Sequence, residues 1–176
     1  PQIETFATLS PLPGFRTWLD TAPEETIEAL LEEGERKALA RLSGQDNPRA
    51  AFQVLLARND WPDDPAVSGA LQGPLRRLAA RYLLARRDNG APVDPVARFH
   101  LKNGARLERI NWLGDVSPKG LRQAAGIMVN YRYDLDDIEA NHEAYMQESR
   151  IVLGNAAQRL IKGWKDADGK QLRRLA

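Results

Sequence analysis

Cysteine is absent from this sequence of 176 residues, and histidine occurs only twice, as His100 and His142. The lack of cysteine excludes disulfides, thiolate nucleophiles and cysteine-based zinc sites. Neither histidine has neighbours at a spacing typical of metal ligands, so we expect no metal site.

Long apolar runs are also missing, since none approaches the roughly 18 residues that a membrane-spanning helix needs. The first residues do not form a basic segment followed by an apolar signal stretch. Opposite charges nearly cancel, with 25 lysines and arginines against 24 aspartates and glutamates, so no overall field favours nucleic acid or an anionic membrane. We expect a soluble, cytoplasmic protein that binds neither. Pro1 stands where an initiator methionine would, which indicates an excised or cleaved piece.

The first half of the chain is predicted to be mostly helical. A short strand over residues 3–9 stops at a turn rich in proline and glycine, with Ser10 just past its carboxyl end. Apolar residues at helical spacing then predict an amphipathic helix over residues 21–44, a shorter one that begins at Asn47 and is closed by residues 59–62, and a third that ends near Gly90.

The pattern changes after Gly90. Residues 97–102 alternate between apolar and polar side chains, which favours a half-buried strand, and residues 105–112 form a second strand with a parity shift typical of a bulge. Asn103 and Gly104 lie between them, and this pair predicts a type I′ turn and hence a β-hairpin.

A short helix from Ser117 to Leu121, a strand over residues 127–133 and a long helix over residues 135–164 complete the chain, with a frayed tail over residues 165–176. Together the elements predict an α+β (mixed α/β) fold in a single domain. Its first half is helix-rich, and a hairpin, a further strand and a long helix follow.

Three residue types could carry chemistry. The pKa of a free histidine, about 6.5, would suit His100 to proton transfer, although a lone strand histidine is more often an ordinary structural residue. Ser10 is exposed by a turn, but serines before proline commonly only shape turns. Tyr131 and Tyr133 point to one face of their strand, and either could be core.

Two further features are interpreted as solvated surface rather than as functional sites. His142 lies among polar residues on a helix and is interpreted as a solvated surface residue. A basic helix could meet nucleotide phosphates, but it lacks a glycine-rich loop and interleaved aromatics, so a solvated face is favoured. Its arginines are Arg76, Arg77, Arg81, Arg86 and Arg87.

Three strings in order carry a resemblance that covers nearly the whole chain: FATLSPLPGF, WPDDPAVSGALQGPLRRLAARYLL and PVARFHLKNGARLERINWLGDVSPKGLRQAAGIMVNYRY. They resemble the carboxy-terminal part of malonyl-CoA decarboxylases. The resemblance implies an acetyltransferase-like (GNAT-like) catalytic fold and a lyase of fatty acid metabolism that converts malonyl-CoA to acetyl-CoA and carbon dioxide without biotin, metal or another cofactor. It implies that Ser10 and His100 are the catalytic pair, and that both contact the substrate together with Tyr133.

The resemblance also defines the expected partners, which are malonyl-CoA, the remaining part of the decarboxylase chain and further copies in a homo-oligomer. Family members carry strands and a glycine-containing loop for the CoA pyrophosphate before the SPxPGF string, and these 176 residues show no such loop. We therefore expect a single partial catalytic domain that is inactive alone. Two alternatives stay open, namely another acyl-CoA enzyme of the acetyltransferase-like class and a non-catalytic interaction module.

Overall fold

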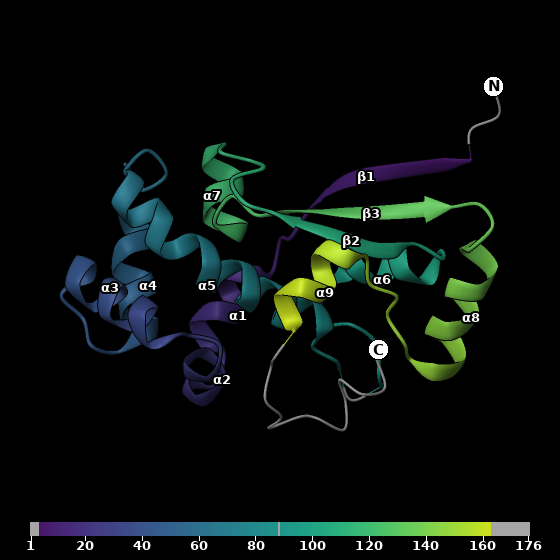
Figure 1. Cartoon of the computed structure of the whole chain (residues 1–176), viewed down its shortest axis with the longest axis horizontal. Helices are drawn as coiled ribbons and strands as arrows, with labels where there is room; N and C mark the ends of the chain where they lie inside the picture. The colour runs from purple at the N-terminus through teal and green to yellow at the C-terminus, as the bar shows by residue number, and fades with distance from the viewer. Residues whose placement is uncertain (1–3, 88, 163–176) are drawn as a thin grey trace.

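The computed structural model describes residues 4–87 and 89–162, and the tail predicted over residues 165–176 lies outside them. Within these ranges, helices gather at one end, and at the other end a small sheet lies above further helices (Figure 1). None of the helices in this part of the chain is both long enough and apolar enough to cross a membrane.

The helical first half begins with α1 (Phe15–Thr21), which was not predicted, and departs from the prediction again in the next segment. The single helix expected over residues 21–44 is wrong, because α2 (Glu24–Ala29) and α3 (Glu33–Ser43) are separate. The break has a local cause: Glu32 is extended and forms a capping box with Glu35, which satisfies free N–H groups of a new helix. The helix α3 ends at Gly44, where the end of the single helix was predicted, and Gly44 lies in the left-handed region with φ 70°.

Two further helices follow the predicted order. In α4 (Pro48–Ala57) the side chain of Asn47 accepts a hydrogen bond from Ala50 N at 3.0 Å, and Pro48 occupies the first turn. In α5 (Pro65–Leu84) Asp64 has the same capping role. This helix ends at Leu84, earlier than predicted.

The sheet has the strand order β1-β3-β2 and is antiparallel throughout. The first strand, β1 (Thr5–Pro11), extends past the predicted end, so Ser10 lies inside it and pairs with Val129 rather than following it. The central strand, β3 (Met128–Asp134), matches its prediction closely. In β2 (Arg106–Asn111) the register shifts between Leu107 and Arg109, which confirms the predicted bulge.

The predicted hairpin is wrong, because residues 97–102 belong to a helix, α6 (Pro95–Lys102). Asp94 accepts a hydrogen bond from Ala97 N at 2.7 Å, and Pro95 holds the first helical position. Asn103 has φ −90°, whereas a type I′ turn needs positive φ, so Asn103 ends the helix instead of turning a hairpin.

The long carboxy-terminal helix is also wrong, because it is two helices, α8 (Ile138–Glu148) and α9 (Asn155–Ile161). The segment between them lies along the outer edge of β2: Leu107 N donates to Val152 O at 2.9 Å, and Gly154 N donates to Leu107 O at 2.8 Å. This pairing satisfies backbone groups at a sheet edge, which a continuous helix could not do.

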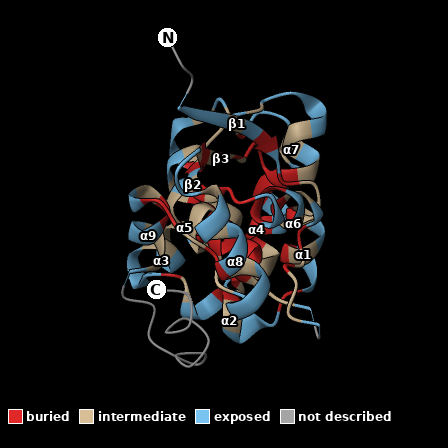
Figure 2. Ribbon diagram, turned by 90° about the vertical axis from the view of Figure 1, so that its right-hand side faces the viewer, coloured by how far each residue is buried: buried red, intermediate tan, exposed pale blue. Residues whose placement is uncertain are grey.

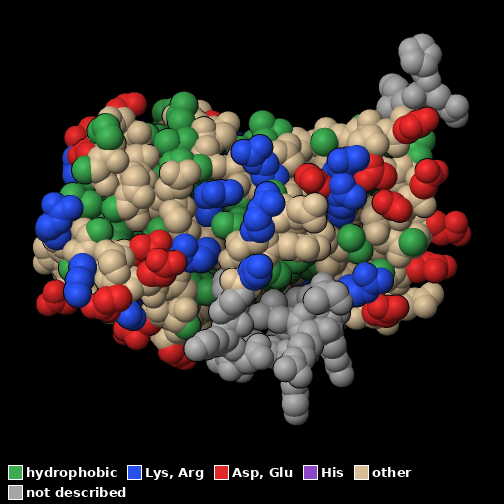
Figure 3. Space-filling view, viewed as in Figure 1, with side chains coloured by type: hydrophobic (Ala, Val, Ile, Leu, Met, Phe, Trp, Pro, Cys, Tyr) green, Lys and Arg blue, Asp and Glu red, His purple; other side chains and the backbone are tan. Residues whose placement is uncertain are grey.

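One continuous core joins the two ends, and Figure 2 shows buried residues between the sheet and the helices beneath it. The helices α5, α6 and α9 contact β2, while α7 (Pro118–Ala124) contacts α1. On the face shown in Figure 3, acidic side chains gather at the α8 end and basic side chains form a central band.

Candidate active site

A chain of hydrogen bonds joins three side chains from β1, α6 and β3. Ser10 Oγ lies 3.0 Å from His100 Nε2, and His100 Nδ1 lies 2.7 Å from the hydroxyl of Tyr133. All three residues are buried, with Ser10 5% and His100 8% exposed. The structure therefore brings together the three residues that the sequence suggested, although 90 residues separate Ser10 from His100.

The sheet register explains how the two strands face the helix. Phe6 pairs with Tyr133, Thr8 with Tyr131 and Ser10 with Val129. Successive side chains alternate between the faces of a strand, so these alternate residues lie on one face. The predicted common face of Tyr131 and Tyr133 is confirmed. Both tyrosines are buried, whereas Asn130, Arg132 and Asp134 are only partly buried.

His100 occupies a different position on its element from the one expected. The strand prediction placed it opposite Ala97 and Leu101, but in α6 all three are buried on one helix face at spacings of three and four residues. Phe99, expected on the inner face, is 64% exposed. Burial lowers the pKa of the His100 imidazole below its ordinary value, so the neutral ring is favoured at neutral pH.

Two residues that sequence reasoning did not select complete the surroundings of this chain. Thr8 Oγ1 lies 3.0 Å from Ser10 Oγ. The sequence contained a signal for this contact, because residues two apart on a strand point to the same face. Phe6 stacks on Tyr133 with ring centroids 4.7 Å apart. Burial raises the pKa of Tyr133, so its hydroxyl keeps the proton and is available as a donor.

A third residue, Asp94, lies at the start of α6 and is fully buried. One carboxylate oxygen caps the helix at Ala97, and the other accepts the hydroxyl of Tyr82 at 3.3 Å. Burial raises the pKa of Asp94 and also that of Tyr82. An aspartate directly before proline at the start of a helix was the sequence signal for this cap.

His142 lies apart from these residues, exposed on α8 as predicted, with Nδ1 2.6 Å from the carbonyl oxygen of Lys102. The solvated face predicted for the basic helix is wrong for three of its arginines. Arg76 donates to Ile110 O, Arg86 donates to Ser149 O, and Arg77 donates to Leu30 O and pairs with Glu35. These side chains tie α5 and its end to other elements rather than facing a nucleotide.

The arrangement can hold and move one proton. When Tyr133 donates to Nδ1, the ring proton lies on Nε2 and faces Ser10; in the other tautomer Ser10 donates to Nε2. Either form keeps a mobile hydrogen beside the serine. No group of three or more histidine or carboxylate residues that could hold a metal is found in residues 4–87 and 89–162.

These features define a class: an α+β domain with a buried serine–histidine–tyrosine site suited to proton transfer. A family model described as the malonyl-CoA decarboxylase C-terminal domain matches residues 1–171, so the chain belongs to the malonyl-CoA decarboxylase family.

Curated relatives and solved structures agree with this family. The chain is 41% identical to "Malonyl-CoA decarboxylase, mitochondrial" of Anser anser anser and 39% identical to that of Rattus norvegicus; each match covers 86% of this chain but only 31% and 32% of the relative. A crystal structure of malonyl-CoA decarboxylase from Rhodopseudomonas palustris superposes with a TM-score of 0.72 at 45% identity, over 89% of this chain and 33% of that one. The structure from Cupriavidus metallidurans gives 0.73 at 36% identity, over 91% and 39%. The chain thus spans about a third of the length of these curated relatives.

Proposed function

We propose that the protein containing this chain decarboxylates malonyl-CoA to acetyl-CoA and carbon dioxide, and that Ser10, His100 and Tyr133 form part of its active site. The observation that carries the proposal is the hydrogen-bonded chain from Ser10 through His100 to Tyr133 in a member of this family. No comparison favours acyl transfer to an amine or a purely structural role.

The reaction needs an acid close to carbon. Loss of carbon dioxide breaks the bond between the carboxylate carbon and the α-carbon, and the electron pair remains on the α-carbon as a thioester enolate. One proton added there completes the acetyl group. Because an enolate is a strong base, a neutral imidazole can supply this proton from Nε2, after which a proton from water restores the ring.

Ser10 and Tyr133 have distinct proposed roles. Ser10 hydrogen-bonds either the departing carboxylate or His100, and its hydroxyl can also face the developing enolate oxygen. Tyr133 keeps a donor on Nδ1 and so holds the proton on Nε2. Burial of the three residues supports the role, since hydrogen bonds aimed at developing charge act more strongly where water is excluded.

The test is turnover of malonyl-CoA by the full-length enzyme, followed as released carbon dioxide. Ser10→Ala and His100→Ala should each lower kcat by about 10²- to 10⁴-fold, which is the usual contribution of a positioned acid or base. His142→Ala, on the exposed histidine of α8, is the matched control and should leave kcat unchanged. Near-normal turnover in either active-site variant would overturn its assignment.

Several narrower proposals accompany this function. We propose an acetyltransferase-like fold, of which the antiparallel sheet β1-β3-β2 would form one part. We also propose that the whole decarboxylase chain, of which these residues are a part, forms a homo-oligomer. This piece alone should release no carbon dioxide from malonyl-CoA. The cytoplasmic location also remains a proposal, whereas the goose and rat relatives carry the word mitochondrial in their names. Light scattering of the purified enzyme tests the oligomer, and fractionation of cells tests the location.

A further inference from the structure

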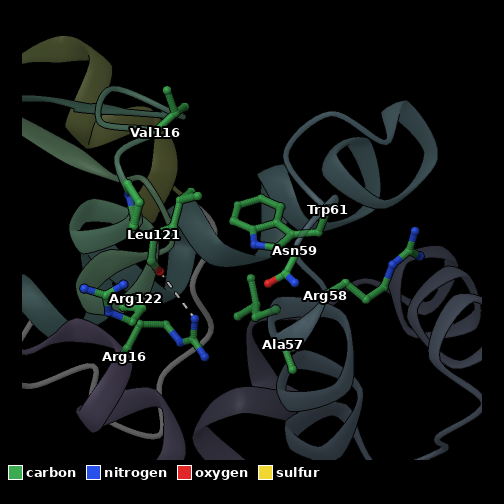
Figure 4. A pocket seen from close by; sticks show the side chains of 10 residues that line it. Arg16, Ala57, Arg58, Asn59, Trp61, Val116, Leu121 and Arg122 are labelled. Atoms are coloured by element: carbon green, nitrogen blue, oxygen red, sulfur yellow. Dashed lines mark hydrogen bonds between the residues drawn. The ribbon is translucent and has the colours of Figure 1, made fainter.

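A cavity of about 590 Å³ lies between the end of α4 and α7, away from the serine–histidine–tyrosine chain (Figure 4). Its volume falls in the range of sites for small organic ligands. None of Ser10, His100 and Tyr133 lines it. Figure 1 shows α4 and α7 toward the left of the molecule, whereas α6, which carries His100, lies to the right.

The walls of this cavity, which we call the arginine pocket, are polar and apolar in nearly equal parts. The apolar part includes Leu56, Trp61, Val116 and Leu121. Val116 is 60% exposed, so a large apolar side chain faces solvent there. Trp61 is buried and packs against Trp112 with ring centroids 5.8 Å apart, which gives the pocket a fixed aromatic wall.

Positive charge in the pocket is not balanced by acids that line it. The residues lining it include Arg16, Arg58 and Arg122, and among these lining residues of the described chain none is acidic. Arg58 is neutralised, because it pairs with Asp60 at 3.0 Å and with Asp64 at 2.8 Å. The unbalanced charge therefore comes from the other two arginines.

The guanidinium of Arg16 has more hydrogen-bond donors than its neighbours supply acceptors. Its Nε is buried and has no hydrogen-bond partner in the described part of the chain, and Nη1 makes one long bond of 3.5 Å to the carbonyl oxygen of Leu121. A guanidinium carries five N–H donors, and leaving a buried donor unsatisfied costs about 1–3 kcal/mol. Burial lowers the pKa of Arg16, and Asp20 opposes this shift only in part.

Arg122 supplies the second charge from α7. It is exposed, and its side chain makes no hydrogen bond or ion pair with residues 4–87 or 89–162. Guanidinium groups bind carboxylates and phosphates through paired hydrogen bonds, which are stronger than bonds between neutral groups. The pocket therefore joins two arginines with unused donors to a wall of apolar and aromatic side chains.

We propose that the arginine pocket binds a small organic anion that carries one carboxylate or phosphate group on an apolar or aromatic body. The anionic group binds Arg16 and Arg122, and the body packs against Trp61 and Leu121. This site is separate from the proposed decarboxylase chemistry and does not depend on it.

Calorimetric titration of the full-length protein tests the proposal with three probes: 4-phenylbutyrate, phenyl phosphate and the uncharged 4-phenylbutan-1-ol. At least one of the two anions should bind, at least about tenfold more tightly than the alcohol, and a preference between them identifies carboxylate or phosphate as the recognised group. Arg122→Gln and Arg16→Gln should each weaken the preferred anion about tenfold. Arg41→Gln, which removes an exposed arginine from α3, is the matched control and should leave binding unchanged.

Several results would overturn the proposal. They are failure of both anions to bind, equal binding of the alcohol, and full affinity in Arg122→Gln. Displacement of the bound anion by malonyl-CoA would also overturn it, because the pocket would then belong to the substrate site. If Arg16→Gln fails to fold, the exposed Arg122 decides the question alone.

Discussion

The imidazole of His100 and the ring of Tyr131 lie face to face, with centroids 4.4 Å apart and planes inclined by 17°. Tyr131 is fully buried, and its hydroxyl has no hydrogen-bond partner in the described part of the chain. Burial raises the pKa of this hydroxyl far above its ordinary value, so it stays neutral. The ring therefore fixes the plane of the imidazole, while the hydroxyl is a cost to stability.

Substitution at Tyr131 should separate these two contributions. Tyr131→Phe keeps the stacked ring and removes an unsatisfied buried hydroxyl, so it should raise the free energy of unfolding by about 1 kcal/mol and leave kcat unchanged. Tyr131→Leu removes the ring beside His100 and should lower kcat about tenfold or more, with little change in KM. Thermal unfolding and steady-state kinetics of the full-length enzyme measure both effects. A loss of turnover in Tyr131→Phe would instead give the hydroxyl a part in catalysis.

Tyr133 should behave in the opposite way, because its hydroxyl has a partner. Tyr133→Phe keeps the stack on Phe6 but removes the 2.7 Å hydrogen bond to His100 Nδ1. Loss of one hydrogen bond of about 1 kcal/mol or more should lower kcat by about tenfold. It should also change the pH profile of kcat/KM, which reports titration of the imidazole. An unchanged profile together with full activity would remove Tyr133 from the site.

The lowered pKa of His100 also predicts how stability depends on pH. Above its ordinary pKa of 6.5 the imidazole is neutral in both the folded and the unfolded chain, so His100 does not reduce the free energy of unfolding there. As the pH falls from 6.5 toward the lower folded pKa, the unfolded chain takes up a proton first, so the free energy of unfolding decreases. His100→Gln should remove this part of the pH dependence, whereas His142→Gln should keep it. Urea titrations between pH 8 and pH 5 give the free energy of unfolding of the parent protein and both variants. An equal dependence of this free energy on pH in all three proteins would contradict the expectation.

How far the sequence determined the site depends on the kind of signal. Local periodicity left Ser10, His100 and Tyr133 ambiguous, since each could be structural, and only the resemblance joined them. The structure brings the three together through long-range pairing of β1 with β3 and packing of α6 against the sheet. No local pattern contains such contacts.

The errors in the fold have the same origin. Ala97 and Leu101, four residues apart, fit one helix face as well as one strand face, and the exposure of Phe99 is what distinguishes the two interpretations. The cap formed by Asp94 and Pro95 was a helix signal, but the pair Asn103 and Gly104 favoured a hairpin. The break between α8 and α9 depends on pairing with β2, which lies far away in the sequence.

Asp94 should affect both the stability of α6 and the position of His100. Asp94→Ala removes the cap on Ala97 and leaves the buried hydroxyl of Tyr82 without its acceptor, so it should cost about 2 kcal/mol or more. Asp94→Asn keeps a capping oxygen without a buried charge and should cost less. Calorimetric unfolding ranks the variants, and the kcat of Asp94→Ala should fall because α6 carries His100. Equal stability of Asp94→Ala and the parent protein would show that the cap is dispensable.

Gly104 is the point at which the chain leaves α6 for β2, and its backbone has φ +82°. A Cβ at this position would meet the carbonyl oxygen and side chain of Ile138. Gly44 provides a matched comparison, since it has φ +70° and nothing within 4 Å of an added Cβ. Gly44→Ala should therefore cost only the left-handed conformation, about 1–2 kcal/mol. Gly104→Ala should cost several kcal/mol because the clash with Ile138 is added. Chemical denaturation of both variants measures the difference, and equal losses would mean that α8 moves aside freely and does not hold the end of the helix that carries His100.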